Sequence, residues 1–303
     1  MTRPKATGEK VWLITGATSG LGASLVEAVL ARGDKVIATA RPASREKLRA
    51  VVDALPPRDR DENRIRTLDL DVTDTAENIR ASMKTAIGQW GRVDVLVNNA
   101  GVVVGGVTEE EGAEAFLEQF KTNVFGVINV TNAVLPHMRE RRDGTVVIIG
   151  SRSAWANIPG VAQYSASKAA IHSYADTLAG EVRHLNIRVL PVAPAAFRTS
   201  GFTPPTPLGQ PIADYNPLRT QLAEMVKVRI VENPEVGDPR KGMEILVDVV
   251  RGEGRAAGRE WPSLLFLGPE AQKQIRAKSA MWEHNLRAWT DVCCDVLEER
   301  RLN

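Results

Sequence analysis

Residues 10–22 read KVWLITGATSGLG, which places a short apolar run directly before three closely spaced glycines. The apolar run predicts a strand at Lys10–Thr15, and the residues after the turn predict a helix near Gly20–Arg32. Glycines at a strand-to-helix turn let the backbone approach a diphosphate, and the helix N-terminus adds free N–H groups. The segment therefore predicts a nucleotide-binding turn. We expect its contacts at Gly16, Thr18, Ser19, Gly20, Leu21 and Gly22.

The same alternation of strand and helix patterns continues along the chain. Further strands are predicted at Lys35–Thr39, Arg64–Leu70, Val93–Asn98, Thr145–Ile149 and Ile187–Val192. Helices are predicted near Ser44–Leu55, Thr75–Trp90, Ala113–Met138 and Val161–Leu185. Alternation of this kind builds βαβ units, so the predicted fold is a doubly wound parallel α/β sheet in three layers, the Rossmann fold. Ligands of such sheets bind beyond the carboxyl ends of the strands.

The pattern changes after Val192, where a proline-rich stretch runs to Pro217. A long loop of this kind is typical of a lid or a binding loop. Later elements are predicted near Pro217–Glu232, Pro239–Arg251, Trp261–Leu267 (a strand) and Pro269–Arg300. We interpret residues 1–303 as one domain, with a substrate loop and helices at 194–260 and a C-terminal helical extension at 268–303.

Composition narrows the function classes. The chain has 303 residues, 43% of them hydrophobic and 25% charged, which supports a sizeable core. A net charge of +2 argues against a nucleic-acid partner. No signal peptide or apolar run of about 20 residues is visible, so no membrane span is expected. The adjacent Cys293 and Cys294 form no disulfide framework, which favours the cytoplasm. Four scattered histidines predict no metal site. They are His137, His172, His184 and His284.

The end of the second strand indicates which cofactor is bound. Dinucleotide enzymes that prefer NAD place an acidic residue there, on the ribose 2′-hydroxyl. Residues 38–41 read ATAR and contain no acid, and Arg41 offers a permanent planar cation suited to a phosphate. A solvated surface arginine is the alternative interpretation. The predicted cofactor is NADP(H).

The spacing T-G-x-x-x-G-x-G resembles that of the short-chain dehydrogenase/reductase superfamily, in its short, non-extended branch. Asp71 and Val72, after the third strand, match the family's adenine contact. Residues 98–101 match its N-N-A-G motif, which implies that Asn98, Ala100 and Gly101 steady the sheet and line the cofactor.

A tyrosine–lysine pair carries the predicted chemistry. Of three tyrosines only Tyr164 has a lysine four residues later, Lys168, on the same helix face. A nearby ammonium favours the phenolate, which suits a general acid/base. The family resemblance adds Ser151 as the residue that holds the substrate oxygen. It also adds Asn123, with a water-bridged link to Lys168, and implies that Lys168 binds the nicotinamide ribose.

These matches imply an NADPH-dependent enzyme that reduces a ketone or aldehyde to an alcohol, or the reverse. A non-catalytic NADP(H)-binding sensor is the alternative from another class. Ser165 and Lys168 also fit the S-x-x-K motif of serine acyl enzymes, but the required S-D-N and K-T-G elements are missing.

The expected partner is a small-molecule substrate with a carbonyl or alcohol group. By resemblance Thr199 binds the carboxamide, and Ala195 replaces the family's glycine, which predicts shifted nicotinamide packing. Trp155, Phe202 and Tyr215 are candidate pocket walls or packing residues. Arg152 and Arg198 suggest either an anionic substrate or solvated arginines.

The predicted assembly is a homodimer or homotetramer. The helices near Ala113–Met138 and Val161–Leu185 match the family's usual contact surfaces, although core burial explains their apolar residues equally well. Trp282 and Trp289 lie seven residues apart on one face of the extension. We expect them either to cover the pocket or to alter assembly.

Overall fold

The computed structural model describes residues 8–156, 158–199, 209–226, 228, 236–294 and 296. Its strands form one parallel sheet of seven in the order β3-β2-β1-β4-β5-β6-β7. The strands are β1 Val11–Ile14, β2 Lys35–Ala40, β3 Ile65–Asp69, β4 Val95–Asn98, β5 Gly144–Ile149, β6 Ile187–Pro194 and β7 Leu265–Leu267. The predicted doubly wound sheet is confirmed, and each predicted strand is present.

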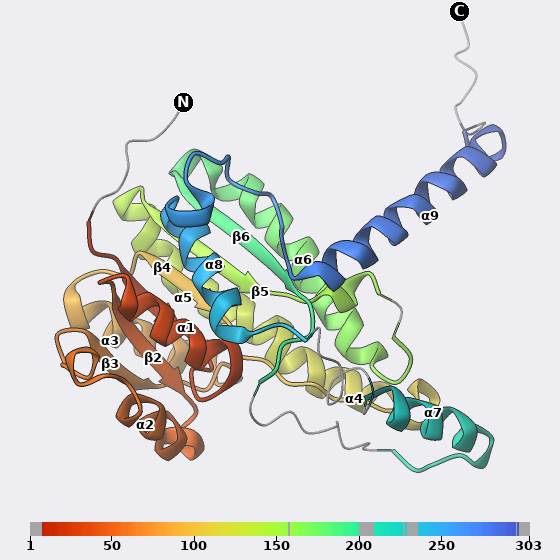
Figure 1. Cartoon of the computed structure of the whole chain (residues 1–303), viewed down its shortest axis with the longest axis horizontal. Coiled ribbons are helices and arrows are strands. Elements are labelled where there is room, and N and C mark those ends of the chain that lie inside the picture. The colour runs from red at the N-terminus through yellow and green to blue at the C-terminus, as the bar shows by residue number, and fades with distance from the viewer. Residues whose placement is uncertain are drawn as a thin grey trace, which may run out of the picture.

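Helices cover both faces of the sheet, as Figure 1 shows. They are α1 Gly20–Ala31, α2 Arg45–Asp53, α3 Ala76–Trp90, α4 Thr108–Phe120, α5 Val127–Arg141, α6 Ala162–Val182, α7 Asn216–Val226, α8 Pro239–Arg251 and α9 Pro269–Cys293. Short helical turns are η1 Pro42–Ser44, η2 Pro57–Asp59, η4 Arg152–Ala154, η5 Arg183–Leu185, η6 Ala213–Tyr215 and η8 Gly254–Ala256.

Successive side chains of the central strands point to opposite faces of the sheet and pack into two separate hydrophobic cores. Trp12 and Ile14 of β1 pack with α1 and α8, whereas Val11 and Leu13 pack with α3, α5 and α6. All four residues of β1 are buried, as expected for a parallel strand covered on both faces. The three-layer arrangement follows from this two-sided burial, because neither face of the sheet can remain exposed to water.

The helix predicted near Ala113–Met138 is wrong as a single element. The structure has α4, then a π-helical turn, η3 Lys121–Gly126, and then α5. Gly126 explains the close approach of this turn to the segment after β3, since a Cβ there would lie 2.8 Å from a methyl group of Val72. A π-helical turn within a helix frequently marks a functional site.

Other boundaries differ by smaller amounts. The helix predicted at Pro239–Arg251 matches α8, and the strand predicted from Trp261 begins only at Leu265. Instead of pairing in the sheet, Trp261 donates its indole N–H to the carbonyl oxygen of Val189. The end of the predicted Pro217–Glu232 helix lies outside the described residues, as do residues 297–300 of the predicted terminal helix.

Two features bear on partners. Among the described residues, no helix combines the length and apolar character needed to cross a bilayer. In the same part of the chain, no cluster of three or more His, Cys, Asp or Glu side chains is arranged to hold a metal ion.

A buried carboxylate, Asp94, ties the amino ends of the central strands together. It accepts the backbone N–H of Val11 at 2.8 Å and pairs with Arg92 at 2.6 Å and Arg141 at 2.7 Å. Burial alone would raise the pKa of Asp94, but the hydrogen bonds from Arg92, Val11 and Arg141 outweigh it and lower this pKa. The ionised form of Asp94 therefore stabilises the folded state.

We predict that Asp94→Ala lowers the free energy of unfolding by about 3 kcal/mol at pH 7, because it leaves two cations without their partner. In wild type this contribution is present above the ordinary carboxylate pKa of about 4 and is lost as pH falls through the lower folded value. Urea denaturation at pH 7 and pH 3 measures both effects. Asp53→Ala, in an exposed pair with Arg49, is the control. Equal stabilities of the two variants at pH 7 would contradict the assignment.

Candidate active site

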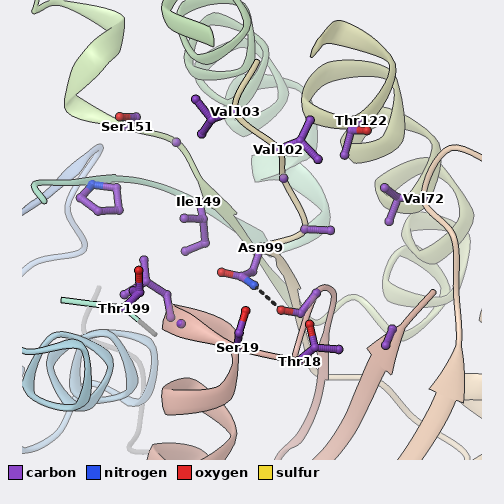
Figure 2. Close-up of a pocket in the computed structure, with 18 of the residues that line it drawn as sticks. Thr18, Ser19, Val72, Asn99, Val102, Val103, Thr122, Ile149, Ser151 and Thr199 are labelled. Carbon is purple, nitrogen blue, oxygen red and sulfur yellow. Dashed lines mark hydrogen bonds between the residues drawn. The ribbon is translucent and has the colours of Figure 1, made fainter. Parts of the chain in front are cut away.

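A cavity of about 450 Å³ opens at the carboxyl ends of the strands (Figure 2). It brings together fourteen of the seventeen residues predicted as contacts. They are Gly16, Thr18, Ser19, Gly20, Leu21, Arg41, Asp71, Val72, Ala100, Gly101, Ser151, Tyr164, Lys168 and Thr199. The remaining three, Gly22, Asn98 and Asn123, do not line the cavity.

The glycine turn has the geometry that its sequence predicts. Gly16 has a φ of +67°, and a Cβ there would lie 2.8 Å from the Cα of Ala100. A Cβ at Gly22 would lie 2.3 Å from the carbonyl oxygen of Gly16, so Gly22 lets α1 pack against the turn without facing the cavity. The Ser19 side chain makes no capping hydrogen bond at the N-terminus of α1. The Ser19 side chain therefore does not satisfy the first N–H groups of α1, and free N–H groups at a helix N-terminus can bind an anion.

The turn is held by the segment after β4. Asn99 donates its amide Nδ2 to the carbonyl oxygens of Thr15 and Gly16, at 2.9 and 3.0 Å. The Thr15 hydroxyl accepts the backbone N–H groups of Asn99 and Ala100, both at 3.0 Å. Figure 2 shows Asn99 between the Thr18–Ser19 turn and Ile149. Of the two asparagines of the N-N-A-G motif, the one that lines the cavity is thus Asn99, which the sequence interpretation passed over.

Asn98, in contrast, points to the other side of the sheet. It is 2% exposed and donates its Nδ2 to the hydroxyl of Thr131 on α5 at 2.9 Å. Consecutive side chains of a strand face opposite sides, so only one of the two asparagines can face the cavity. The structure gives Asn98 a packing position.

Ser151, Tyr164 and Lys168 converge at the end of β5. Lys168 donates from Nζ to the carbonyl oxygen of Ile149 at 2.8 Å, and Nζ lies 5.7 Å from the centre of the Tyr164 ring. Burial lowers the pKa of Lys168 to about 8. Ser151 presents its hydroxyl from an extended backbone, where Oγ also contacts Oγ of Ser153 at 3.0 Å.

The phenol of Tyr164 differs from the sequence expectation in direction. Burial raises its pKa above the ordinary value, and this effect exceeds the lowering by a hydrogen bond with Ser151 and by the charge of Arg152. The phenol is therefore protonated at neutral pH, which suits a proton donor.

Asn123 does not line the cavity, but it holds Val102, which does. Its side-chain oxygen accepts the N–H of Val102 at 2.9 Å, and its Nδ2 donates to the Val102 carbonyl at 3.0 Å and contacts Oγ of Ser167 at 3.3 Å. The neighbouring Thr122 lines the cavity instead. Asn123 thus joins the π-helical turn to α6 and to the segment after β4.

The chain matches a known protein family over the residues that form β1 to β6 and this site. The sequence profile described as short chain dehydrogenase matches residues 10–206. The chain belongs to the short-chain dehydrogenase/reductase family. It is accordingly an oxidoreductase that depends on NAD or NADP.

Relatives extend the match over most of the chain. Oxidoreductase BOA17 from Botryotinia fuckeliana is 33% identical over 287 residues, 93% of this chain and 97% of the relative. The 3-ketodihydrosphingosine reductase of Bacteroides thetaiotaomicron is 32% identical over 273 residues, 90% of this chain and 93% of the relative. A short-chain dehydrogenase from Streptomyces avermitilis, 34% identical, superposes with a TM-score of 0.79 and covers 96% of this chain and 100% of its own.

Those candidate substrate residues of this short-chain dehydrogenase/reductase that the structure describes do not form the walls of the cavity. Trp155 packs behind Ser151, 4.6 Å from the His172 ring and 5.6 Å from Phe266. Tyr215 instead donates its hydroxyl to Glu109 of α4, and Phe202 lies outside the described residues. Arg152 and Arg198 also lie outside the cavity wall, and Arg152 donates to Gln274 of α9 at 2.5 Å.

Ala195, which replaces the family's glycine, is accommodated without disturbing the strand. Its N–H donates to the carbonyl oxygen of Leu267 at 2.8 Å, which continues the pairing of β6 with β7. A Cβ on Gly268 would lie 3.0 Å from the Ala195 methyl, so a glycine at 268 makes room for it. Ala195 lines the cavity.

Sequence reasoning missed twelve lining residues, most of them next to predicted ones. They are Ala40, Ser44, Leu70, Thr73, Asn99, Val102, Val103, Thr122, Ile149, Gly150, Pro194 and Phe197. Their signal was position, since nearly all follow the carboxyl end of a strand.

His172, one turn after Lys168, is a further missed residue. Its Nε2 accepts the backbone N–H of Ser151 at 3.2 Å. A Cβ on Gly150 would lie 2.1 Å from this nitrogen, so the ring fills the space that a side chain at 150 would need. Burial, reinforced by the charge of Lys168, lowers the pKa of His172 to about 4. The imidazole is neutral at physiological pH and can accept this hydrogen bond.

We predict that His172→Leu lowers the free energy of unfolding by about 1–3 kcal/mol, because the buried Ser151 N–H loses its acceptor. It also lowers kcat, since Ser151 is no longer held, but leaves the affinity for the dinucleotide cofactor unchanged. His172→Gln, which keeps an acceptor oxygen, recovers part of both losses. Thermal unfolding and steady-state kinetics test this. Identical behaviour of the Leu and Gln variants would rule out a role for the acceptor.

Proposed function

We propose that this protein is an NADP(H)-dependent oxidoreductase that interconverts a ketone or aldehyde and an alcohol, with Tyr164 as general acid/base. The observation that carries the proposal is the convergence of Ser151, Tyr164 and Lys168 on one cavity with the glycine turn. A ketone is the functional group named for one relative, the 3-ketodihydrosphingosine reductase. This supports the substrate class, a small molecule with a carbonyl or hydroxyl group.

The residues of the cavity fit a dinucleotide. Gly16 and Gly20 leave room for a diphosphate beside the N-terminus of α1. Asp71 and Val72, which match the family's adenine contact, line the cavity, and Thr199 lies beside the glycine turn, 3.2 Å from the Cβ position of Gly20. When bound, the nicotinamide supplies or accepts the hydride.

Arg41 supports the choice of NADP(H). It lines the cavity at the end of β2 beside Ser44, and its side chain makes no hydrogen bond or ion pair with the described residues. The neighbouring cation, Arg45, is paired with Asp69. A guanidinium and a hydroxyl at this end suit a ribose 2′-phosphate, and no carboxylate stands at the end of β2 to repel it.

The proton chemistry follows from burial. A carbonyl oxygen that accepts hydrogen bonds from Ser151 and Tyr164 becomes more electrophilic at carbon, and the Tyr164 phenol then gives its proton to that oxygen. Lys168 brings a positive charge near the phenol ring, which favours the phenolate left behind. Asn123 contributes by holding Val102 and Ser167 in place. Its water-bridged link to Lys168 belongs to the same proposal.

A cytoplasmic location and a homodimer or homotetramer complete the proposal. Cys293 and Cys294 are free and exposed, as suits a reducing compartment. Phe125, beside α5, is 55% exposed and offers apolar surface to a second copy.

We predict that Tyr164→Phe lowers the rate of NADPH oxidation about 10³-fold with any carbonyl compound that the wild type reduces. Binding of NADPH is retained, since only the hydroxyl is removed. A panel of ketones and aldehydes followed by NADPH absorbance, with NADPH fluorescence for binding, provides the measurement. Undiminished turnover by the variant would refute Tyr164 as the proton donor. A wild type that binds NADPH but turns over no compound would favour the sensor alternative.

We predict that Arg41→Gln raises the KM for NADPH about 10–100-fold, because a charge-assisted contact to the 2′-phosphate is lost. The KM for NADH is unchanged. Arg45→Gln, whose native arginine is committed to Asp69, serves as the matched control. An equal effect on both cofactors would show that Arg41 does not read the 2′-phosphate.

A further inference from the structure

Helix α9 stands away from the rest of the protein (Figure 1). At about 1.5 Å per residue its 25 residues extend roughly 37 Å. Only its first turns contact the body, where Ala271 is buried and Gln274 accepts a hydrogen bond from Arg152. Every residue from 279 to 294 is exposed. The expectation that Trp282 and Trp289 cover the pocket is therefore wrong.

One face of α9 carries a regular seam of mostly apolar side chains. The spacing alternates between four and three residues, which is the heptad pattern of paired helices. The seam consists of Ile275, Ser279, Trp282, Leu286, Trp289 and Cys293. Its two tryptophans are 43% and 58% exposed, and Leu286 is 67% exposed.

A helix in this setting needs a partner. Helical stability in proteins comes mainly from packing of the apolar face, and from Ser279 onward this seam is exposed, with no packing partner among the described residues. With side chains of about 150–250 Å², the exposed seam and its neighbours Met281 and Val292 offer apolar surface on the order of 500 Å². Patches of this size commonly mark interaction sites, and a standard interface buries about 800 Å² on each partner.

The charges beside the seam indicate a second copy of the same helix. Lys278 and Glu283 flank the seam on opposite sides, five residues apart. In a parallel pair of identical helices this spacing brings Lys278 of one copy to Glu283 of the other, twice by symmetry. Within a single copy, Lys278 lies over Trp282, 5.3 Å from the ring centre, and Glu283 pairs with Arg287 at 2.8 Å. Both contacts are exposed and weak, so they do not compete strongly.

A membrane surface fits the polar side of α9 less well. Helices that lie on anionic lipid carry a strongly basic polar face. Helix α9 has four basic and three acidic residues, an almost balanced set. They are Lys273, Arg276, Lys278, Arg287, Glu270, Glu283 and Asp291.

We propose that two copies of this protein associate through α9, with the helices parallel and the seams facing one another in register. Trp282, Leu286 and Trp289 form the centre of the contact. The parallel direction places each seam residue opposite its own counterpart, and the two catalytic domains lie at the same end of the pair.

Solution mass tests the contact. Leu286→Glu places two like charges opposite one another in the seam, and we expect the molar mass measured by light scattering to fall twofold. His284→Glu makes the same change on the opposite face of the helix and leaves the mass unchanged. Far-ultraviolet circular dichroism of both variants checks that the catalytic domain is folded. An unchanged mass for Leu286→Glu, or an equal fall in both variants, would overturn the proposal.

Cross-linking tests the parallel register. In a background that carries Cys293→Ser and Cys294→Ser, Ser279→Cys places a thiol in the seam opposite its counterpart. A mild thiol oxidant is expected to convert most of this variant to a disulfide-linked dimer. Ala280→Cys, one residue outside the seam, should yield at least fivefold less dimer. No cross-link at 279, or equal cross-linking at both positions, would overturn the parallel arrangement. Sedimentation of the wild type with phosphatidylserine vesicles, with loss of that binding in Leu286→Glu but no change in mass, would assign α9 to a membrane instead.

Discussion

The site is organised around one buried cation. Lys168 of α6 is 6% exposed and donates to the carbonyl oxygen of Ile149, the last residue of β5. An ammonium group in this position loses much of its hydration, which is why its pKa falls to about 8. The contact also fixes how α6 lies on the end of β5. Tyr164, His172 and Ser151 take their places from that arrangement, since all three belong to α6 or directly follow β5.

Burial shifts the pKa values of two neighbouring side chains in opposite directions. Burial raises the pKa of the Tyr164 phenol and lowers the pKa of the His172 imidazole. The phenol stays protonated and can donate, and the imidazole stays neutral and can accept the Ser151 N–H. The glycine turn is stabilised independently by the Thr15 and Asn99 hydrogen bonds. In the proposed function, cofactor binding and proton transfer therefore depend on different contacts within one cavity.

The strands and helices that follow a repeating pattern of apolar residues could be predicted from the sequence. The features that depend on tertiary contacts could not. Strand positions followed from apolar runs such as residues 11–14, because a parallel strand covered on both faces must be apolar throughout. The π-helical turn at Lys121–Gly126 was not visible, since it forms around the contacts of Asn123 with Val102 and Ser167. The choice between Asn98 and Asn99 was equally hidden, because either can follow a strand end. Trp155 was a candidate either for a pocket wall or for packing, and only the structure shows that it packs on His172.

The C-terminal extension shows the same division. The sequence predicted its helix and the seven-residue spacing that puts the two tryptophans on one helix face. Whether that face contacts the pocket depends on the direction in which α9 leaves β7, which the sequence does not show. The predicted division into a substrate segment, 194–260, and an extension, 268–303, stays a prediction. So do the roles assigned to the individual site residues.

The most direct measurement is the pH dependence of kcat/KM for carbonyl reduction at saturating NADPH, which reports groups in the form of the enzyme that meets the carbonyl compound. Of the two groups proposed to act in proton transfer, Lys168 and Tyr164, Lys168 loses its proton first as pH rises, since the pKa of Tyr164 is raised. A fall above about pH 8, tenfold per pH unit, is the predicted result. A rate that stays constant to pH 10 would contradict the central role of the buried lysine and phenol.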